Sequence, residues 1–268
     1  MESICRNCET NYAKEYNYCP NCSQKSTLHR LTFHDVLHEG LHYFTHADKG
    51  LFQLIRDLAK KSGIVAREYI EGKRKKYFPP LTFFFLIAAV FVFVATVGEP
   101  KVTPDVLKAH PELNKIVSLA ERQNAIHVYE RGNKVQHFTN KYSNLMAMCS
   151  LPLTALIFWL FYRKARYNYI EHLVAGMYML GFCILIYALL ILPTSYLFHF
   201  GNNYAVLVFF VFQLFYFTVF YHGFLNKKSK TAYIKSLLAS IVSIFVWVIF
   251  SASIIRIYIT SGFWGMLK

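Results

Sequence analysis

Long apolar runs alternate with short charged clusters over most of the chain. Five runs carry almost no charge and are close to the roughly 20 residues that an α-helix needs to cross a hydrocarbon core. They lie near residues 81–98, 145–162, 173–198, 204–225 and 236–255. Only helices satisfy all their own backbone hydrogen bonds in lipid without a closed barrel. The pattern predicts an all-α polytopic membrane domain over residues 78–268, with about five transmembrane helices.

A helical pattern also precedes the first span. Apolar positions between Leu51 and Leu58 recur at helical spacing, a break is expected at residues 62–63, and the pattern resumes up to residue 70. Residues 28–77 are therefore predicted to form amphipathic juxtamembrane helices with a basic end. Such helices lie along the membrane surface or pack beneath the spans.

The start of this juxtamembrane segment carries a column of histidines. Thr32 is expected to cap a helix together with Asp35, three residues later. The histidines recur at every fourth position: His34, His38, His42 and His46. Side chains four residues apart are neighbours on a helix, so this column is a candidate second metal site. We favour the alternative of a solvated or headgroup-facing surface, because the sequence shows no ligand from another segment.

Composition agrees with a membrane protein. The 268 residues are 55% apolar and 18% aromatic but only 16% charged, against about 25% charged in soluble proteins. The formal net charge of +14 is spread over juxtamembrane loops rather than one soluble face. It is therefore no signature of nucleic-acid binding. Contact of the amino-terminal segment with RNA or a ribosome stays an open alternative without a motif to support it.

The distribution of lysine and arginine predicts an orientation. Basic clusters at residues 72–76, 163–166 and 227–230 fall on one side if all five runs cross, and short cytoplasmic loops are enriched in these residues. The amino terminus is then cytoplasmic and the carboxyl terminus extracytoplasmic, with the first span as an uncleaved signal anchor. Residues 99–143 form the extracytoplasmic segment, in which we expect a helix over 111–123 and a turn at Gly132 and Asn133.

The basic cluster before the first span has a second candidate role. It comprises Lys73, Arg74, Lys75 and Lys76. Each cation near a negatively charged leaflet contributes about 1 kcal/mol of attraction. These residues are therefore candidate contacts for anionic lipids, although topology alone also accounts for them.

Four cysteines near the amino terminus have the spacing C-x2-C-x10-C-x2-C: Cys5, Cys8, Cys19 and Cys22. In a reducing cytosol thiols stay free, and two Cys-x-x-Cys pairs at this spacing predict a tetrahedral zinc site. Four thiolates leave no coordination position for water, so Zn²⁺ is expected to be structural within a zinc ribbon at residues 1–27. A redox dithiol and an iron centre are the alternatives. Cys149 and Cys183 lie in apolar runs and are expected to be buried.

Few polar side chains lie deep in the apolar runs. Gln213 is expected to hydrogen-bond another helix, and a line of serines on the last run has helix-packing spacing: Ser236, Ser240 and Ser243. Pro152 and Pro193 are expected to kink their helices. Intramembrane ionisable groups usually mark proton-coupled transport or catalysis, and these runs almost lack them. Membrane proteolysis and proton-coupled transport are therefore disfavoured.

Residues 5 to about 85 resemble a known family. The segments CPNCSQ, HEGLHYFTHADKGLFQLIRDL and REYIEGKRKKYFPP are similar to multi-pass membrane proteins of Bacteroidota with an amino-terminal four-cysteine zinc ribbon and a domain of unknown function. Glu9 and Ser23 follow the two cysteine pairs, where ribbons often carry glycine. The resemblance implies a bacterial inner membrane location and brings no established activity.

These observations leave two main classes of function. The first is a non-enzymatic inner-membrane accessory or assembly protein that docks a membrane protein or complex through its zinc ribbon and helices. The second is a transporter or channel for a lipid or another apolar substrate, which would use the bundle interior. A membrane enzyme is a third class and would require a metal at the histidine column.

Overall fold

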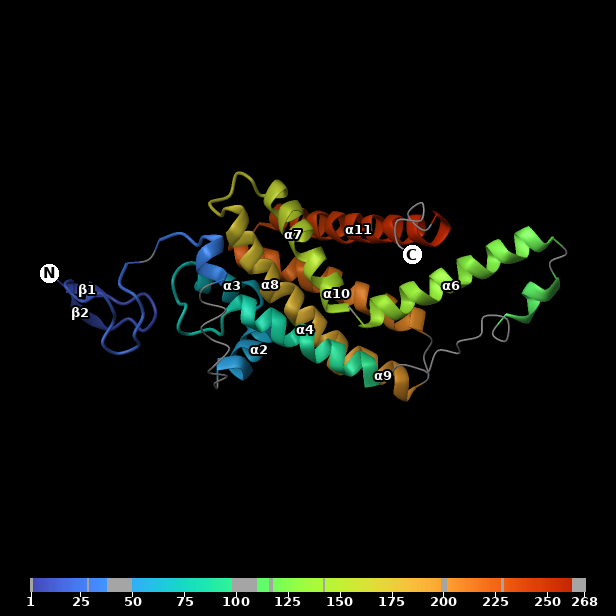
Figure 1. Cartoon of the computed structure of the whole chain (residues 1–268). Coiled ribbons are helices and arrows are strands. Elements are labelled where there is room, and N and C mark those ends of the chain that lie inside the picture. The colour runs from blue at the N-terminus through green and yellow to red at the C-terminus, as the bar shows by residue number, and fades with distance from the viewer. Residues whose placement is uncertain are drawn as a thin grey trace.

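Helices make up most of the protein, as the computed structural model shows (Figure 1). The structure describes residues 2–27, 29–37, 50–97, 110–115, 118–141, 143–198, 202–227 and 229–261. The cysteine-rich segment lies at one end of the molecule, and the long helices run side by side away from it. The cysteines therefore lie in a small segment outside the group of long helices.

The amino-terminal segment contains the only β-ladder among the described residues. Strands β1 (Glu2–Ile4) and β2 (Asn11–Ala13) pair antiparallel, with Ser3 opposite Tyr12. An isolated bridge joins Tyr18 and Lys25. We call residues 2–27 the cysteine module.

Two short helices, which we call the collar, follow it. They are α2 (Gly50–Lys61) and α3 (Gly63–Ile70), as the apolar spacing predicted. Leu54 and Leu58 of α2 are fully buried. Ser62 separates the helices with a φ of 49°, a left-handed conformation that interrupts the helical path.

Among the described residues, three helical segments are long and apolar enough to cross a membrane by length and composition: Tyr169–Ser195, Tyr204–Leu225 and Lys230–Thr260. They confirm the third, fourth and fifth predicted spans as long apolar helices. The first comprises α8 (Tyr169–Ile186), the π-helical turn η2 (Tyr187–Ile191) and α9 (Leu192–Leu197). The others lie in α10 (Asn202–Leu225) and α11 (Lys230–Ser261).

The first two predicted spans correspond to helices with shorter apolar stretches. In α4 (Pro80–Val97) the apolar part covers Pro80–Ala95, and in α7 (Ser143–Phe161) it covers Met148–Phe161. Pro152 lies inside α7, and Pro193 is the second residue of α9, the helix that follows η2. Helices at these positions are therefore observed, while the count of five crossings stays a prediction.

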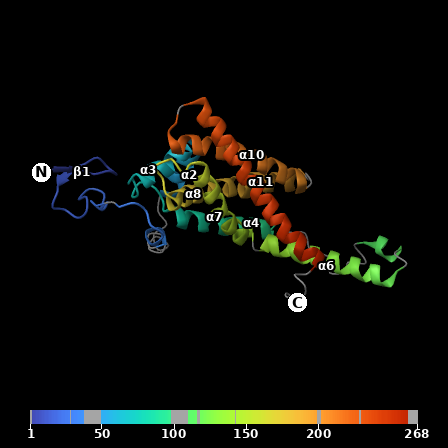
Figure 2. The ribbon, with the colours of Figure 1, turned by 90° about the horizontal axis from the view of Figure 1, so that it is seen from above.

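Helix α8 is the centre of the bundle. It packs against α4, α7 and α10, while α10 also packs against α11 and α3. Figure 2 shows α11 crossing the outside of this group. In the most apolar stretch of each segment, 72% of the residues are buried in Tyr169–Ser195 but only 17% in Lys230–Thr260. Helix α11 therefore presents most of its apolar surface outward.

The segment predicted to be extracytoplasmic differs from expectation. A 3₁₀ turn, η1 (Pro111–Lys115), precedes helix α6 (Leu119–Lys141), which runs straight through Gly132 and Asn133. The predicted turn at those two residues is wrong. The Gly-Asn pair has only a weak local preference for a turn, and the residues on either side of it continue the helix.

Contacts bring three connecting segments to the cysteine end of the bundle. Arg166 forms an ion pair with Glu71, which links the α7–α8 loop to the end of α3. The Arg67 guanidinium donates to the Gly223 carbonyl at 3.1 Å, which links α3 to the end of α10. The predicted basic clusters therefore share one end of the molecule with the cysteine module.

Two expectations about buried side chains are corrected. Cys183 is buried as expected, but Cys149 is exposed because it lies on a face of α7 that no described helix covers. Gln213 is only 8% exposed, yet its amide makes no hydrogen bond to another helix among the described residues. It lines a cavity instead.

Candidate metal centre and its attachment to the bundle

The two Cys-x-x-Cys segments fold into matching backbone turns. The Cys5 amide donates to the Thr10 carbonyl at 3.0 Å, and the Cys19 amide donates to the Gln24 carbonyl at 2.8 Å. In return, the amides of Glu9 and Ser23 donate to the carbonyls of Cys5 and Cys19, at 3.0 and 2.9 Å. Each turn thereby directs both of its thiols to the same side.

Both turns end in a left-handed residue that is not glycine. Glu9 has a φ of 62° and Ser23 a φ of 57°. These are the two positions where zinc ribbons often carry glycine. Side chains with a Cβ adopt this region at a cost, so the turns are retained against a local conformational penalty.

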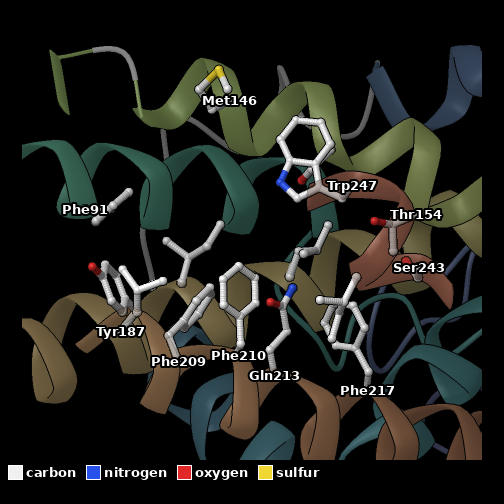
Figure 3. A pocket seen from close by; sticks show the side chains of 15 residues that line it. Phe91, Met146, Thr154, Tyr187, Phe209, Phe210, Gln213, Phe217, Ser243 and Trp247 are labelled. Atoms are coloured by element: carbon white, nitrogen blue, oxygen red, sulfur yellow. The ribbon is translucent and has the colours of Figure 1, made fainter. Parts of the chain in front are cut away.

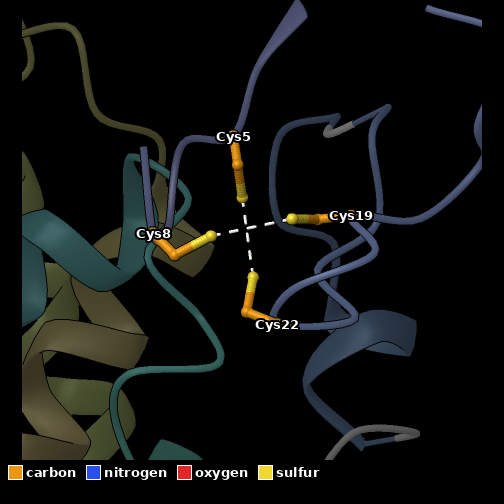
Figure 4. Close-up of side chains that lie close together, drawn as sticks. All are labelled: Cys5, Cys8, Cys19 and Cys22. Atoms are coloured by element: carbon orange, nitrogen blue, oxygen red, sulfur yellow. Dashed lines mark hydrogen bonds between the residues drawn. The ribbon is translucent and has the colours of Figure 1, made fainter. Parts of the chain in front are cut away.

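The four sulfurs converge on one point, as Figure 4 shows. Cys5 Sγ lies 3.6 Å from Cys22 Sγ, and Cys8 Sγ lies 3.6 Å from Cys19 Sγ. All four sulfurs lie within 4.8 Å of one another. A disulfide has sulfurs about 2.05 Å apart, so these thiols are free. A tetrahedral ion with metal–sulfur bonds of about 2.3 Å places its ligands about 3.8 Å apart, which fits this cluster.

The surroundings of the sulfurs also suit metal binding. Cys5 and Cys19 are 3% and 2% exposed, and Tyr12 packs beside them. Hydrogen bonds with Thr10 lower the pKa of the Cys8 thiol to about 6, whereas burial raises the pKa of the Cys22 thiol to about 12. Of these two thiols, Cys8 is therefore the one that more readily forms the thiolate. The thiolate is the metal-binding form of cysteine. No other cluster of three or more metal-ligating side chains occurs in the part of the chain that the structure describes.

The second cysteine turn is bonded to the segment that precedes α4. Gln24 is 5% exposed, and its side-chain carbonyl accepts the Lys75 amide at 3.3 Å. The Arg74 guanidinium donates to the His29 carbonyl at 3.2 Å. Two predicted lipid-binding residues thus also make contacts that hold the cysteine module against the bundle.

Arg30 makes a second attachment, to the amino terminus of α8. Its guanidinium donates to both carboxylate oxygens of Glu171, at 3.3 and 2.9 Å. Glu171 also forms a capping box with Asn168 and is only 4% exposed. A buried carboxylate with a bidentate arginine is strongly oriented. The link between the cysteine module and the collar is therefore fixed at one defined point of the bundle.

Glu68 of α3 neutralises part of the basic cluster. Its carboxylate accepts from Lys73 at 3.2 Å, from Lys76 at 2.7 Å and from the Tyr77 hydroxyl at 2.5 Å. Burial alone would raise the pKa of Glu68, but hydrogen bonds from Lys76, Tyr77 and Lys73 outweigh burial and lower the pKa to about 2. Lys75 is the exposed lysine of the cluster.

The histidine column is described only at its start. The predicted cap is present, because Thr32 and Asp35 exchange side-chain and backbone hydrogen bonds of 2.7 to 3.3 Å. His34 is exposed on the helical turn at 33–37. His38, His42 and His46 lie outside the described residues, so the second metal site stays a prediction.

Sequence reasoning missed the residues that attach the module. Asn168 and Glu171 have the three-residue spacing of a capping box, which was a detectable local signal. Gln24 and Arg30 gave no such signal, because their partners are distant along the chain. Arg30 and Glu171 are 141 residues apart.

Comparison with known proteins identifies one family segment. A family described as "Protein of unknown function (DUF3667)" matches residues 48–92, which cover the collar, the basic cluster and most of α4. Curated proteins and solved structures give no match to the chain.

Proposed function

We propose that this protein is a non-enzymatic accessory or assembly protein of a bacterial inner membrane, which docks a membrane protein or complex. The observation that carries the proposal is the fixed attachment of a closed four-cysteine cluster to the bundle. Arg30 and Gln24 make that attachment through Glu171 and the backbone of Lys75. A module with no open coordination position, held in a set place, is suited to binding a partner rather than to catalysis.

The proposed metal is Zn²⁺, bound by Cys5, Cys8, Cys19 and Cys22. Zinc has no redox chemistry and favours tetrahedral thiolate sites. Its role is structural, because the three buried apolar side chains of the module supply very little apolar burial.

The proposed topology has five crossings with a cytoplasmic amino terminus and an extracytoplasmic carboxyl terminus. The shared position of the loops around Arg67, Arg166 and Gly223 supports it. Short loops rich in lysine and arginine stay on the cytoplasmic side of the membrane. Helices α4 and α7 flank the central α8, which supports their inclusion as spans. The exposed Lys75 then lies close to anionic headgroups.

The proposed docking surface includes large side chains that the module leaves exposed. Ile4, Tyr16 and Tyr18 are 68%, 56% and 59% exposed. Tyrosines are enriched at the energetic centres of protein interfaces. Phe33, which follows the module in the sequence, is also exposed, at 54%.

Affinity purification of the full chain from its native membranes in mild detergent tests the proposal. A stoichiometric partner should be captured by the natural chain and lost from a double variant, Tyr16→Ser with Tyr18→Ser, that still contains zinc. Tyr129→Ser serves as the matched control, because Tyr129 is also exposed but lies on α6. A natural chain that purifies alone, or a partner that the double variant retains, would overturn the docking role.

A further inference from the structure

The bundle encloses a cavity at the level of the apolar helices. Its volume is about 280 Å³, and its lining comes from α4, α7, α8, η2, α10 and α11 (Figure 3). None of the described residues that line it is charged. The deep part is formed by buried residues such as Leu180 and Phe217, whereas Val206 at the rim is 40% exposed. The cavity therefore opens toward one side of the bundle.

An unused hydroxyl lies in the deep part of this cavity. Ser236, Ser240 and Ser251 of α11 each donate to the carbonyl four residues earlier, at 2.8 to 3.1 Å. Ser243 lies on the same helix and is 1% exposed, but its hydroxyl has no hydrogen-bond partner among the described residues. An unsatisfied buried polar group costs about 1–3 kcal/mol. A bound molecule that accepts a hydrogen bond from this hydroxyl would remove the cost.

Gln213 of α10 supplies a second polar group. Figure 3 shows its amide directed into the space below Trp247, with Ser243 and Thr154 further along the cavity. The structure shows no hydrogen bond for this amide within the described chain. A primary amide offers two N–H donors and one carbonyl acceptor. In an apolar setting such groups are normally satisfied, so this arrangement points to a ligand with a polar atom.

The remaining walls select for an uncharged, apolar molecule. The rings of Tyr187, Phe209, Phe210 and Trp247 line the cavity with Phe217. Tyr187 begins the π-helical turn η2, and single π-helical turns recur at functional sites. A dry cavity of roughly 150 Å³ is sufficient for benzene, so this one has room for a ring or part of a chain. A charged group would lie in this cavity without a partner.

We propose that the cavity binds an uncharged, lipid-soluble carbonyl compound. Oxygen atoms of the bound molecule accept hydrogen bonds from the Gln213 amide and from the Ser243 hydroxyl, and the apolar part lies among the aromatic side chains. Two sources share this chemistry: a quinone ring with an apolar tail and the ester carbonyl of a neutral diacylglycerol. This site is independent of the docking role at the cysteine module.

Binding can be followed by fluorescence, because Trp247 lines the cavity. The probe is a naphthoquinone with a short isoprenoid tail, added to the full chain in lipid nanodiscs. We expect saturable quenching that is absent from Trp247→Phe. Gln213→Leu and Ser243→Ala should each weaken binding about tenfold, which corresponds to the loss of one buried hydrogen bond. Ser251→Ala is the matched control, because its hydroxyl already bonds the Trp247 carbonyl.

Competition distinguishes the two sources. Displacement of the probe by diacylglycerol would show that the site binds ester lipids. Displacement by quinones alone would show that it binds a quinone ring. Helix content and metal content measured on every variant show that the bundle is intact. Quenching that never saturates, or that is unchanged in both Gln213→Leu and Ser243→Ala, would overturn the proposal. Equal competition by an anionic fatty acid would also overturn it.

Discussion

The cysteine module and the helical bundle bury very different amounts of apolar surface. In the module the buried apolar residues are Cys5, Tyr12 and Cys19, and two of these are the candidate metal ligands. In the bundle a single cluster extends from the collar to α11 and contains fully buried rings such as Tyr178 and Phe220. Under the proposed zinc site the module obtains its folding free energy from the bound ion, whereas the bundle obtains it from packing.

Loss of a cysteine ligand should give the largest difference in stability between the two regions. Structural zinc contributes an apparent binding free energy of about 10–16 kcal/mol in small zinc-dependent domains. We expect Cys19→Ser to abolish stoichiometric zinc and to unfold residues 2–27, while the helices α8 and α10 remain folded. Metal analysis and hydrogen exchange resolved by segment would measure both effects.

The free cysteine on α7 provides the control for this substitution. Cys149 is exposed and lies outside the metal cluster, so Cys149→Ser should keep both the zinc and the protected module. The comparison between module and bundle fails if Cys19→Ser retains the metal. It also fails if α8 loses its protection together with the module.

Within the bundle, the largest single effect is expected at the crossing of α3 and α10. A Cβ at Gly63 would lie 1.8 Å from the Phe220 carbonyl oxygen and 2.6 Å from the Phe224 amide nitrogen. Backbone atoms cannot move aside singly, so Gly63→Ala should force the helices apart. Overpacking of this kind costs roughly 3 kcal/mol or more. Unfolding by denaturing detergent, followed by circular dichroism, would measure the loss.

Gly223 offers a matched control on the same crossing. A Cβ there would be 3.6 Å from the Gly63 amide nitrogen, which is ordinary contact. Gly223→Ala should therefore change the free energy of unfolding by less than about 1 kcal/mol. Equal stability of the two alanine variants would show that α3 does not pack tightly on α10.

The stability of the collar should depend on the charge of Glu68, which accepts hydrogen bonds from Lys73, Lys76 and Tyr77. Its pKa is lowered from an ordinary value of 4.5 to about 2, so the folded state favours the carboxylate. The stabilisation is complete above about pH 4.5 and is lost as the pH falls toward 2. Glu68→Gln should lower the free energy of unfolding by roughly 1–2 kcal/mol at pH 7 and flatten this pH dependence.

Acid also removes metal from thiolates, so the Glu68 measurement is best made in the Cys19→Ser background. Collar unfolding between pH 2 and 5 would be compared with and without Glu68→Gln. Glu121→Gln is the control, because Glu121 is an exposed carboxylate of α6. An identical pH dependence in Glu68→Gln and its parent would contradict the assigned role of the carboxylate.

Different parts of this comparison were predictable to different degrees. The collar helices and three long spans follow from apolar spacing and length, which are local properties of the chain. The convergence of the cysteine pairs follows from their spacing. The bond between Arg30 and Glu171 depends on two segments 141 residues apart, and no local pattern indicates it. The cavity at Gln213 was missed because a buried amide usually finds a partner helix.

The smallest predicted effect lies in the backbone of the cysteine turns. Glu9 and Ser23 have φ values of 62° and 57°, where glycine avoids a penalty of about 1 kcal/mol. Glu9→Gly and Ser23→Gly should therefore each tighten zinc binding severalfold, as measured by competition with a chelator. Lys14→Gly, at an exposed position without positive φ, should weaken it slightly. Weaker binding in both glycine variants would mean that the Glu9 and Ser23 side chains, rather than their backbone geometry, support the metal centre.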